Sequence, residues 1–237
     1  EGGRGVHRFE HAAVTEGAPV LSVRDLHFPA LPPMTFDIRR GEIAFLRDEN
    51  YNTGRRLHEC FLGDRGWTSG FFRLNGRLYQ PGDLGRVIGS EIGIQIERPD
   101  RPGGVLFDNM TALDNLCTSL IPKAGQHIIR KKIVSSILSE ALRWFPKEML
   151  LQPLSSWSYP ERLRFSYYRW YLLNPRLLIC FFPFAGQEST HHKMIIDLLV
   201  LCAQRGMAVW IISSGIDAIC EKTDNEEFLR RLHYLNK

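Results

Sequence analysis

The chain has few cysteines, no long apolar run and no strong excess of charge of either sign. Its 237 residues include five cysteines and no CxxC pair, which excludes a disulfide scaffold and favours buried free thiols in a reducing cytosol. The apolar stretches around 177–185 and 207–213 are far shorter than the roughly 20 residues that a membrane helix needs. The net charge is +4, which is too mild to indicate a nucleic-acid partner.

The overall composition is that of a folded soluble domain. Hydrophobic residues make up 44% and charged residues 24%, which excludes a disordered or collagen-like chain. Residues 1–18 lack any periodicity and are expected to form a tail or linker. We expect residues 19–237 to form one α/β domain, because this length can bury one large core.

Short apolar or alternating segments indicate strands in the first and last thirds of the chain. The expected strands are 19–26, 35–39, 43–46, 70–74, 92–96, 177–182 and 207–213, with a turn at Asn75-Gly76 after the fourth. The runs at 177–182 and 207–213 are continuously apolar, as in parallel strands that are covered on both faces. A helix is expected at 193–205.

Helical spacing dominates residues 111–170. Apolar residues recur every three or four positions from Ile129 to Phe145, which predicts one long amphipathic helix. Farther on, Arg162, Arg164 and Arg169 are interpreted as one basic helix face that contacts solvent or an acidic partner. The sequence therefore predicts an α/β core that is interrupted by a helical insert.

Five short segments occur in a specific order and spacing. They are 39–43 (RRGEI), 92–107 (beginning IGIQIER), 110–116 (MTALDNL), 169–179 (RWYLLNPRLLI) and 206–214 (GMAVWIISS). Together they resemble the ATP-binding cassette (ABC) ATPases, in particular the second, C-terminal cassette of sugar importers, over roughly residues 19–222. The resemblance implies an α/β, P-loop NTPase-like fold with a mixed or parallel core sheet, a small antiparallel β subdomain and a helical subdomain at about 98–170.

The resemblance also places the phosphate-binding loop of the family at 48–56. Such a loop needs a lysine for the phosphates and a Ser or Thr hydroxyl for Mg²⁺, but Gly54 and Arg55 stand at those two positions. A shift by one residue would pair Gly54-Arg55 with the family's Gly-Lys, and Arg56 would then replace the hydroxyl. Neither register restores the loop chemistry.

Other residues of this loop also differ from the family pattern. Asp48 and Glu49 would repel a polyphosphate, and Tyr51 stands where a glycine is expected. A helix N-terminus near Thr53 remains available for an anion. We therefore expect no resident cofactor, and ATP with Mg²⁺ only if some nucleotide binding persists.

The family's catalytic carboxylates are replaced as well. Phe181 and Phe182 stand at the positions of the metal-holding Asp and the water-activating Glu, and Glu188 stands where a later Asp is expected. A phenyl ring offers no oxygen to a hard cation and accepts no proton. No catalytic or metal-binding residue is therefore expected.

The signature motif that contacts a partner's nucleotide is altered too. Ser158 survives, but Tyr159 and Pro160 replace its two glycines, and proline has no N–H to donate. Phe28 lies near the position of an adenine-stacking aromatic, although a core or edge aromatic is the favoured interpretation. The adjacent His191 and His192 are not expected to form a metal pair.

The resemblance implies a catalytically inactive cassette that pairs with an active cassette, a membrane permease or both. Its location would be cytoplasmic and peripheral, at the inner face of the plasma membrane. An intact docking groove around 97–115 would favour this transport role. The alternatives are a regulatory or sensory interaction module derived from a cassette, and an ATPase with rearranged residues that uses Glu188, Asp48 or Glu49.

Overall fold

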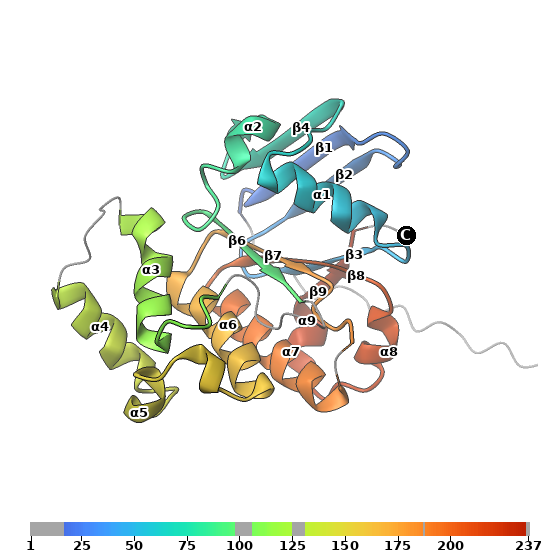
Figure 1. The fold of residues 1–237 in the computed structure, drawn as a ribbon. Coiled ribbons are helices and arrows are strands. Elements are labelled where there is room, and N and C mark those ends of the chain that lie inside the picture. The colour runs from blue at the N-terminus through green and yellow to red at the C-terminus, as the bar shows by residue number, and fades with distance from the viewer. Residues whose placement is uncertain (1–16, 98–105, 125–130, 187, 236–237) are drawn as a thin grey trace, which may run out of the picture.

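The strands in the described part of the chain form two sheets (Figure 1). The computed structural model describes residues 17–97, 106–124, 131–186 and 188–235. A five-stranded parallel sheet has the order β6-β7-β8-β3-β9. Its strands are β3 (Ile43–Arg47), β6 (Ile92–Ile96), β7 (Leu177–Phe181), β8 (Ala208–Ser213) and β9 (Leu232–Tyr234). A four-stranded antiparallel sheet, in the order β2-β1-β4-β5, consists of β1 (Leu21–His27), β2 (Met34–Ile38), β4 (Ser69–Leu74) and β5 (Arg77–Tyr79).

Helices cover the parallel sheet and form a group beside it (Figure 1). Helix α1 (Asn52–Leu62) lies on the same side as the antiparallel sheet, and α6 (Tyr159–Leu173), α7 (Ser189–Gln204) and α9 (Glu226–Arg231) lie on the other. The group at the side consists of α3 (Ala112–Ala124), α4 (Lys131–Ala141) and α5 (Lys147–Leu150). The remaining short helices are α2 (Pro81–Leu84), η1 (Leu154–Ser156) and α8 (Ile216–Cys220).

The central strands are buried on both faces. In β7, Leu177, Ile179 and Phe181 pack toward the antiparallel sheet and α1, whereas Leu178 and Cys180 pack toward α6 and α7. Successive side chains of a strand point to opposite faces, so a strand between two hydrophobic cores has to be apolar throughout. This confirms the covered parallel strands that the continuous apolar runs predict.

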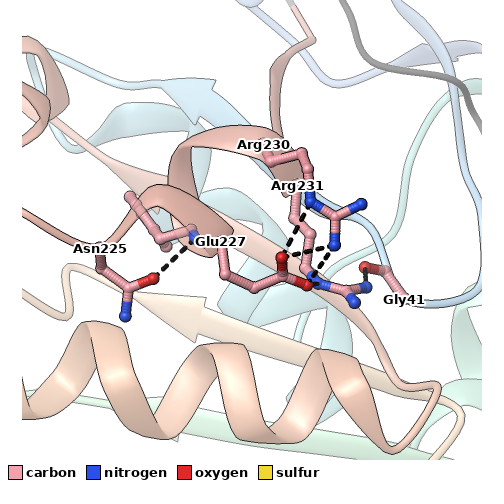
Figure 2. Close-up of polar contacts among 6 residues, drawn as sticks. Gly41, Asn225, Glu227, Arg230 and Arg231 are labelled. Atoms are coloured by element: carbon pink, nitrogen blue, oxygen red, sulfur yellow. Dashed lines mark hydrogen bonds and ion pairs between the residues drawn. The ribbon is translucent and has the colours of Figure 1, made fainter.

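Side chains of helix α9, near the end of the described chain, form hydrogen bonds with one another and with the loop before β3 (Figure 2). Asn225 caps the helix through its side-chain oxygen. The carboxylate of Glu227 accepts hydrogen bonds from Arg230 at 2.5 Å and from Arg231 at 2.6 Å. Arg231 also donates to the carbonyl oxygen of Gly41 at 2.7 Å. Gly41 has a φ of 77°, and a Cβ there would stand 3.0 Å from the Arg231 guanidinium, so glycine permits this approach.

The helix expected from Ile129 to Phe145 is shorter than predicted. Helix α4 ends at Ala141, and residues 142–144 form a turn. Leu142 is therefore 44% exposed, whereas Phe145 is buried as predicted. The ring centroids of Phe145 and Trp157 lie 5.5 Å apart. This tertiary contact places Phe145 in the core although the helix has already ended. Ile129 lies outside the described residues.

The prediction of one solvated basic face on α6 is wrong for Arg169, which is buried, whereas Arg164 is exposed as predicted. Arg162 pairs with Asp108 at 2.5 Å, and Arg164 lies over aromatic rings of the helical group. Arg169 is only 6% exposed. Its guanidinium carbon lies 4.6 Å from the ring centroid of Trp170, and burial lowers the pKa of Arg169 to about 10. Stacking on the Trp170 ring lets the long cation of Arg169 pack where the sequence suggested solvent.

Candidate functional site

Asp48 lies in the loop between β3 and α1, and its carboxylate binds the first turn of α1. Its Oδ2 accepts a hydrogen bond of 2.7 Å from the backbone N–H of Gly54, and its Oδ1 accepts one of 3.2 Å from that of Thr53. Asp48 is only 5% exposed. The first N–H groups of a helix have no partner within the helix and favour negative charge. The carboxylate therefore satisfies two of these donors, and the predicted helix start near Thr53 is confirmed.

The rings of Tyr51 and Phe182 cover this turn. Their centroids lie 4.6 Å apart, and a Cβ added at Gly54 would lie 2.5 Å from the tip of the Phe182 ring. Tyr51 and Phe182 both have left-handed backbones, with φ of 58° and 53°. Bulky residues rarely adopt such angles, which persist only where the surroundings enforce them. The backbone N–H of Phe182 donates a hydrogen bond of 2.8 Å to the carbonyl oxygen of Ile212, which fixes the main chain that carries the ring.

The other residues of the loop from 48 to 56 have separate contacts. Arg55 is exposed, and Arg56 pairs with Glu59 at 3.3 Å. Just before the loop, Arg47 binds both Asp217 and the exposed Glu49, and the hydrogen bond to Asp217 raises the pKa of Arg47. Both acids at 48–49 therefore have partners within the protein.

The two phenylalanines after Cys180 differ in their surroundings. Phe181 is 1% exposed in the core under the antiparallel sheet, and its ring lies 5.7 Å from that of His58. Phe182 lies over Gly54, as described above. The resemblance places both at positions of acidic residues, and in the structure both lie in aromatic packing at the end of β7.

Glu188 lies apart from this packing, at the N-cap of α7. It is exposed, and its backbone oxygen accepts hydrogen bonds from the N–H groups of His191 and His192. The two histidines contact different partners, since the ring of His191 lies 5.3 Å from that of Tyr159 and His192 lies 3.3 Å from the carbonyl oxygen of Phe184. Within the described parts of the chain, no group of three or more His, Cys, Asp or Glu side chains is placed to hold a metal ion.

The residues aligned with the signature motif form the start of α6. The carboxylate of Glu161 accepts hydrogen bonds from the backbone N–H of Ser158 at 2.7 Å and from its hydroxyl at 2.6 Å. Tyr159 and Pro160 follow in the first helical turn, where the missing N–H of proline costs no helical hydrogen bond. Ser158 is thus the N-cap residue of α6 and forms a capping box with Glu161.

Phe28 is buried, which corrects the suggestion that it stacks on adenine. It is 1% exposed and belongs to the core that includes the antiparallel sheet and α1. Stacking on a base requires an accessible ring face. The core interpretation of Phe28 is confirmed.

A buried polar network beside the site has no counterpart in the sequence predictions. Gln95, which is 0% exposed, donates to Glu97 at 2.6 Å and to Ser166 at 3.1 Å, and accepts from the indole of Trp170 at 2.8 Å. It joins β6 to α6. The available signal was a glutamine within an otherwise apolar strand, because a buried amide requires partners.

A second unpredicted feature lies at the start of the helical group. Asn115 is 2% exposed, and its amide accepts from the backbone N–H of Phe107 at 2.8 Å and donates to the Phe107 carbonyl at 3.0 Å. These bonds fix the backbone of Phe107 while its side chain stays on the surface, with the residue 50% exposed. The segment 98–105 within the expected docking groove lies outside the described residues.

The residues around the first turn of α1 do not fit a bound Mg²⁺–polyphosphate in this conformation. A phosphate group there would have to displace the Asp48 carboxylate from the N–H groups of Thr53 and Gly54, since two anions would otherwise meet at short range. The aromatic rings of Tyr51 and Phe182 add apolar surface at the same place.

The arrangement of sheets and helices is that of the ATP-binding cassette of ABC transporters. The chain superposes on cbiO1 from Clostridium perfringens, part of the ABC transporter complex cbiONQ, with a TM-score of 0.69 and 19% identity over 92% of this chain and 85% of that one. For an ABC transporter cassette in its ADP conformation the TM-score is 0.67, with 16% identity over 92% and 88% of the two chains. The predicted fold class is confirmed.

In sequence, the chain is distantly similar to sugar-importer ATP-binding proteins. It is 26% identical to a putative ribose/galactose/methyl galactoside import ATP-binding protein of Pseudomonas syringae pv. tomato over 212 residues, 88% of this chain and 40% of that protein. It is 23% identical to the galactofuranose transporter ATP-binding protein of Escherichia coli over 202 residues, 85% of this chain and 39% of that protein. The chain thus spans about 40% of the length of these curated relatives. No protein-family model matches it.

Proposed function

We propose that the chain is a non-hydrolysing ATP-binding-cassette domain of sugar-importer type, which acts by pairing with an active cassette, a membrane permease or both. The observation that supports this most is the end of β7, where Phe181 is buried in the core and Phe182 packs on Gly54. Losing a general base typically lowers a rate by about 10²–10⁴-fold, and the metal ligand is replaced here as well. The similarity to sugar importers supports the transport role.

The exposed ring of Phe107 supports a role in protein contact. Its backbone is fixed by Asn115, and the neighbouring Asp108 is fixed by Arg162. A rigid, half-exposed aromatic costs little entropy when a partner buries it, and such residues often dominate binding energy. Among the described residues, no helix is long and apolar enough to cross a membrane, and we propose that the domain reaches the inner face of the plasma membrane through a permease.

The loss of hydrolysis is tested by phosphate release from Mg-ATP, with an active ABC cassette as positive control. We expect release at background and, by calorimetry, no Mg-ATP binding tighter than about 100 μM, because two or three lost charge-assisted hydrogen bonds weaken binding by about a hundredfold or more. Glu188→Gln is the matched variant. Mg²⁺-dependent turnover that this substitution abolishes would contradict the proposal and favour an active ATPase.

The partner is tested by co-expression with a sugar-importer permease and, separately, with an active ATP-binding cassette from the same genome. A stable complex isolated with either product supports the transport role. If the folded chain forms no complex with either, the transport role is wrong, and a regulatory module derived from a cassette becomes the better proposal.

A further inference from the structure

We infer that the carboxylate of Asp48 is the permanent internal anion of the phosphate-loop region, so that the loop from 48 to 54 is closed by its own side chain. The inference rests on the cassette fold and on contacts within the loop. Its test is separate from the test of hydrolysis, because it measures the hydrogen bonds of Asp48 and not turnover. The result is a cassette whose loop is ordered without a nucleotide.

The carboxylate has the geometry of a helix cap, although Asp48 lies outside the helix. Tyr51 is the N-cap residue of α1 and makes no side-chain cap hydrogen bond. Both oxygens of Asp48 instead reach the N–H groups of Thr53 and Gly54, at 3.2 and 2.7 Å. Those N–H groups normally need an external acceptor or a capping side chain. Asp48 provides both acceptors from three residues before the cap.

The backbone of Asp48 is held by the neighbouring strand. Its N–H donates a hydrogen bond of 2.9 Å to the carbonyl oxygen of Ser213, at the end of β8. Arg47, directly before it, is tied to Asp217 in α8. Asp48 therefore has a fixed backbone directly after the core sheet. This limits the entropy that its side chain loses when it forms the two hydrogen bonds.

The aromatic pair packs on the same turn as the Asp48 carboxylate. The ring of Phe182 packs against Gly54, and the ring of Tyr51 packs against Phe182. Asp48 Oδ2 would lie 3.2 Å from a Cβ at Gly54, so the carboxylate and the phenyl ring meet at the same residue. Apolar cover excludes water, which would otherwise compete for the hydrogen bonds to Asp48.

Amide hydrogen exchange at Thr53 and Gly54 tests the inference, because it reports these hydrogen bonds directly. We expect both amides to be protected in wild-type protein without any added anion, and millimolar pyrophosphate to leave that protection unchanged. Asp48→Ala should accelerate their exchange about tenfold or more, as expected for the loss of one net hydrogen bond. The control is Glu49→Ala, which removes a neighbouring exposed carboxylate and should not change exchange at either amide.

Three results would overturn the inference. They are unprotected amides in the wild type, unchanged protection in a folded Asp48→Ala variant, and wild-type protection that appears only with pyrophosphate. If Asp48→Ala does not fold, Asp48→Asn is compared with Glu49→Gln. The amide oxygen of Asn retains one acceptor, so exchange should accelerate at one of the two sites, and protection of both sites would contradict the inference. The experiment measures amide exchange and not hydrolysis. ATP turnover by a protein whose Thr53 and Gly54 amides stay protected would therefore overturn the proposed function alone.

Discussion

Trp170 of α6 donates a hydrogen bond of 2.8 Å from its indole nitrogen to the side-chain oxygen of Gln95 in β6. Gln95 is fully buried, and its amide nitrogen is bonded to Glu97 and Ser166. Each polar end of Gln95 therefore has a partner. A satisfied buried network of this kind fixes the relative position of the elements that it joins.

Substituting Trp170→Phe should lower the free energy of unfolding by about 1–3 kcal/mol, because it leaves the oxygen of Gln95 buried without its donor. Denaturation in urea measures the change. Trp67→Phe is the matched control, since Trp67 is partly exposed and stacks on Phe72, and it should change the free energy of unfolding much less. Equal effects of the two substitutions would contradict a structural role of this hydrogen bond.

Gly54→Ala should destabilise the protein by about 1–3 kcal/mol, the usual cost of overpacking a tight site. The added Cβ would lie 2.5 Å from the Phe182 ring. In a double-mutant cycle, Phe182→Ala should remove most of this cost. Gly82→Ala is the control because a Cβ there meets no atom within 4 Å. A Gly54→Ala cost that persists in the Phe182→Ala background would show that the ring is not its cause.

The fold could be predicted from sequence to a large extent, since its signals are local. Continuous apolar runs indicated β7 and β8, and Asn75-Gly76 indicated the turn between β4 and β5. The end of α4 could not be predicted from period alone, because the position of Phe145 depends on its contact with Trp157, which lies elsewhere in the chain.

The candidate site was predicted less fully than the fold. The resemblance to the family singles out Asp48, Tyr51 and Phe182 and predicts which chemical groups are replaced there. It treated Asp48 only as a repulsive charge, whereas the structure shows that its carboxylate bonds to Thr53 and Gly54. The contact between Gly54 and Phe182 joins α1 to the end of β7, and no local pattern encodes such a pairing.

Under the proposed function, the substitutions Phe181→Asp and Phe182→Glu should not produce ATP turnover, because Gly54 and Arg55 stand where the resemblance to the family places the lysine and the hydroxyl. Phe181 is 1% exposed, so an unpaired carboxylate there should lower stability by several kcal/mol. The control pair is Phe181→Leu and Phe182→Leu, which keeps the site apolar and should cost less. Unfolding and phosphate-release assays measure both effects, and turnover in the restored variant would contradict the expectation.

Phe107→Ala should weaken the complex with a permease or a second cassette at least about tenfold, if the ring acts as an interface anchor. It should leave the free energy of unfolding nearly unchanged, because the ring is half-exposed. Leu142→Ala, at another exposed apolar position, is the matched control. Binding is measured by titration with the isolated complex partner, and an unchanged affinity would exclude Phe107 from the interface.

Glu227→Gln should lower stability at neutral pH and have little effect in acid. Hydrogen bonds from Arg230 and Arg231 hold the pKa of Glu227 below its ordinary value. A carboxylate with a lowered pKa contributes stability that is complete above its pKa in the unfolded chain, about 4.3, and that is lost as the pH falls through its lower pKa in the folded protein.

The expected cost of Glu227→Gln at pH 7 is about 1 kcal/mol or less, since the ion pairs are partly exposed and screened by solvent. The difference in free energy of unfolding between wild type and variant should be constant from about pH 7 to pH 5 and shrink below about pH 4. Glu226→Gln, at an exposed position of the same helical turn, should show no such difference. Arg231 also binds the carbonyl oxygen of Gly41, in the loop before β3 (Figure 2). Loss of the Glu227 carboxylate therefore removes one of the two contacts of the side chain that joins α9 to this loop. A wild-type advantage that persists unchanged at pH 3 would show that Glu227 stabilises the helix by something other than its charge.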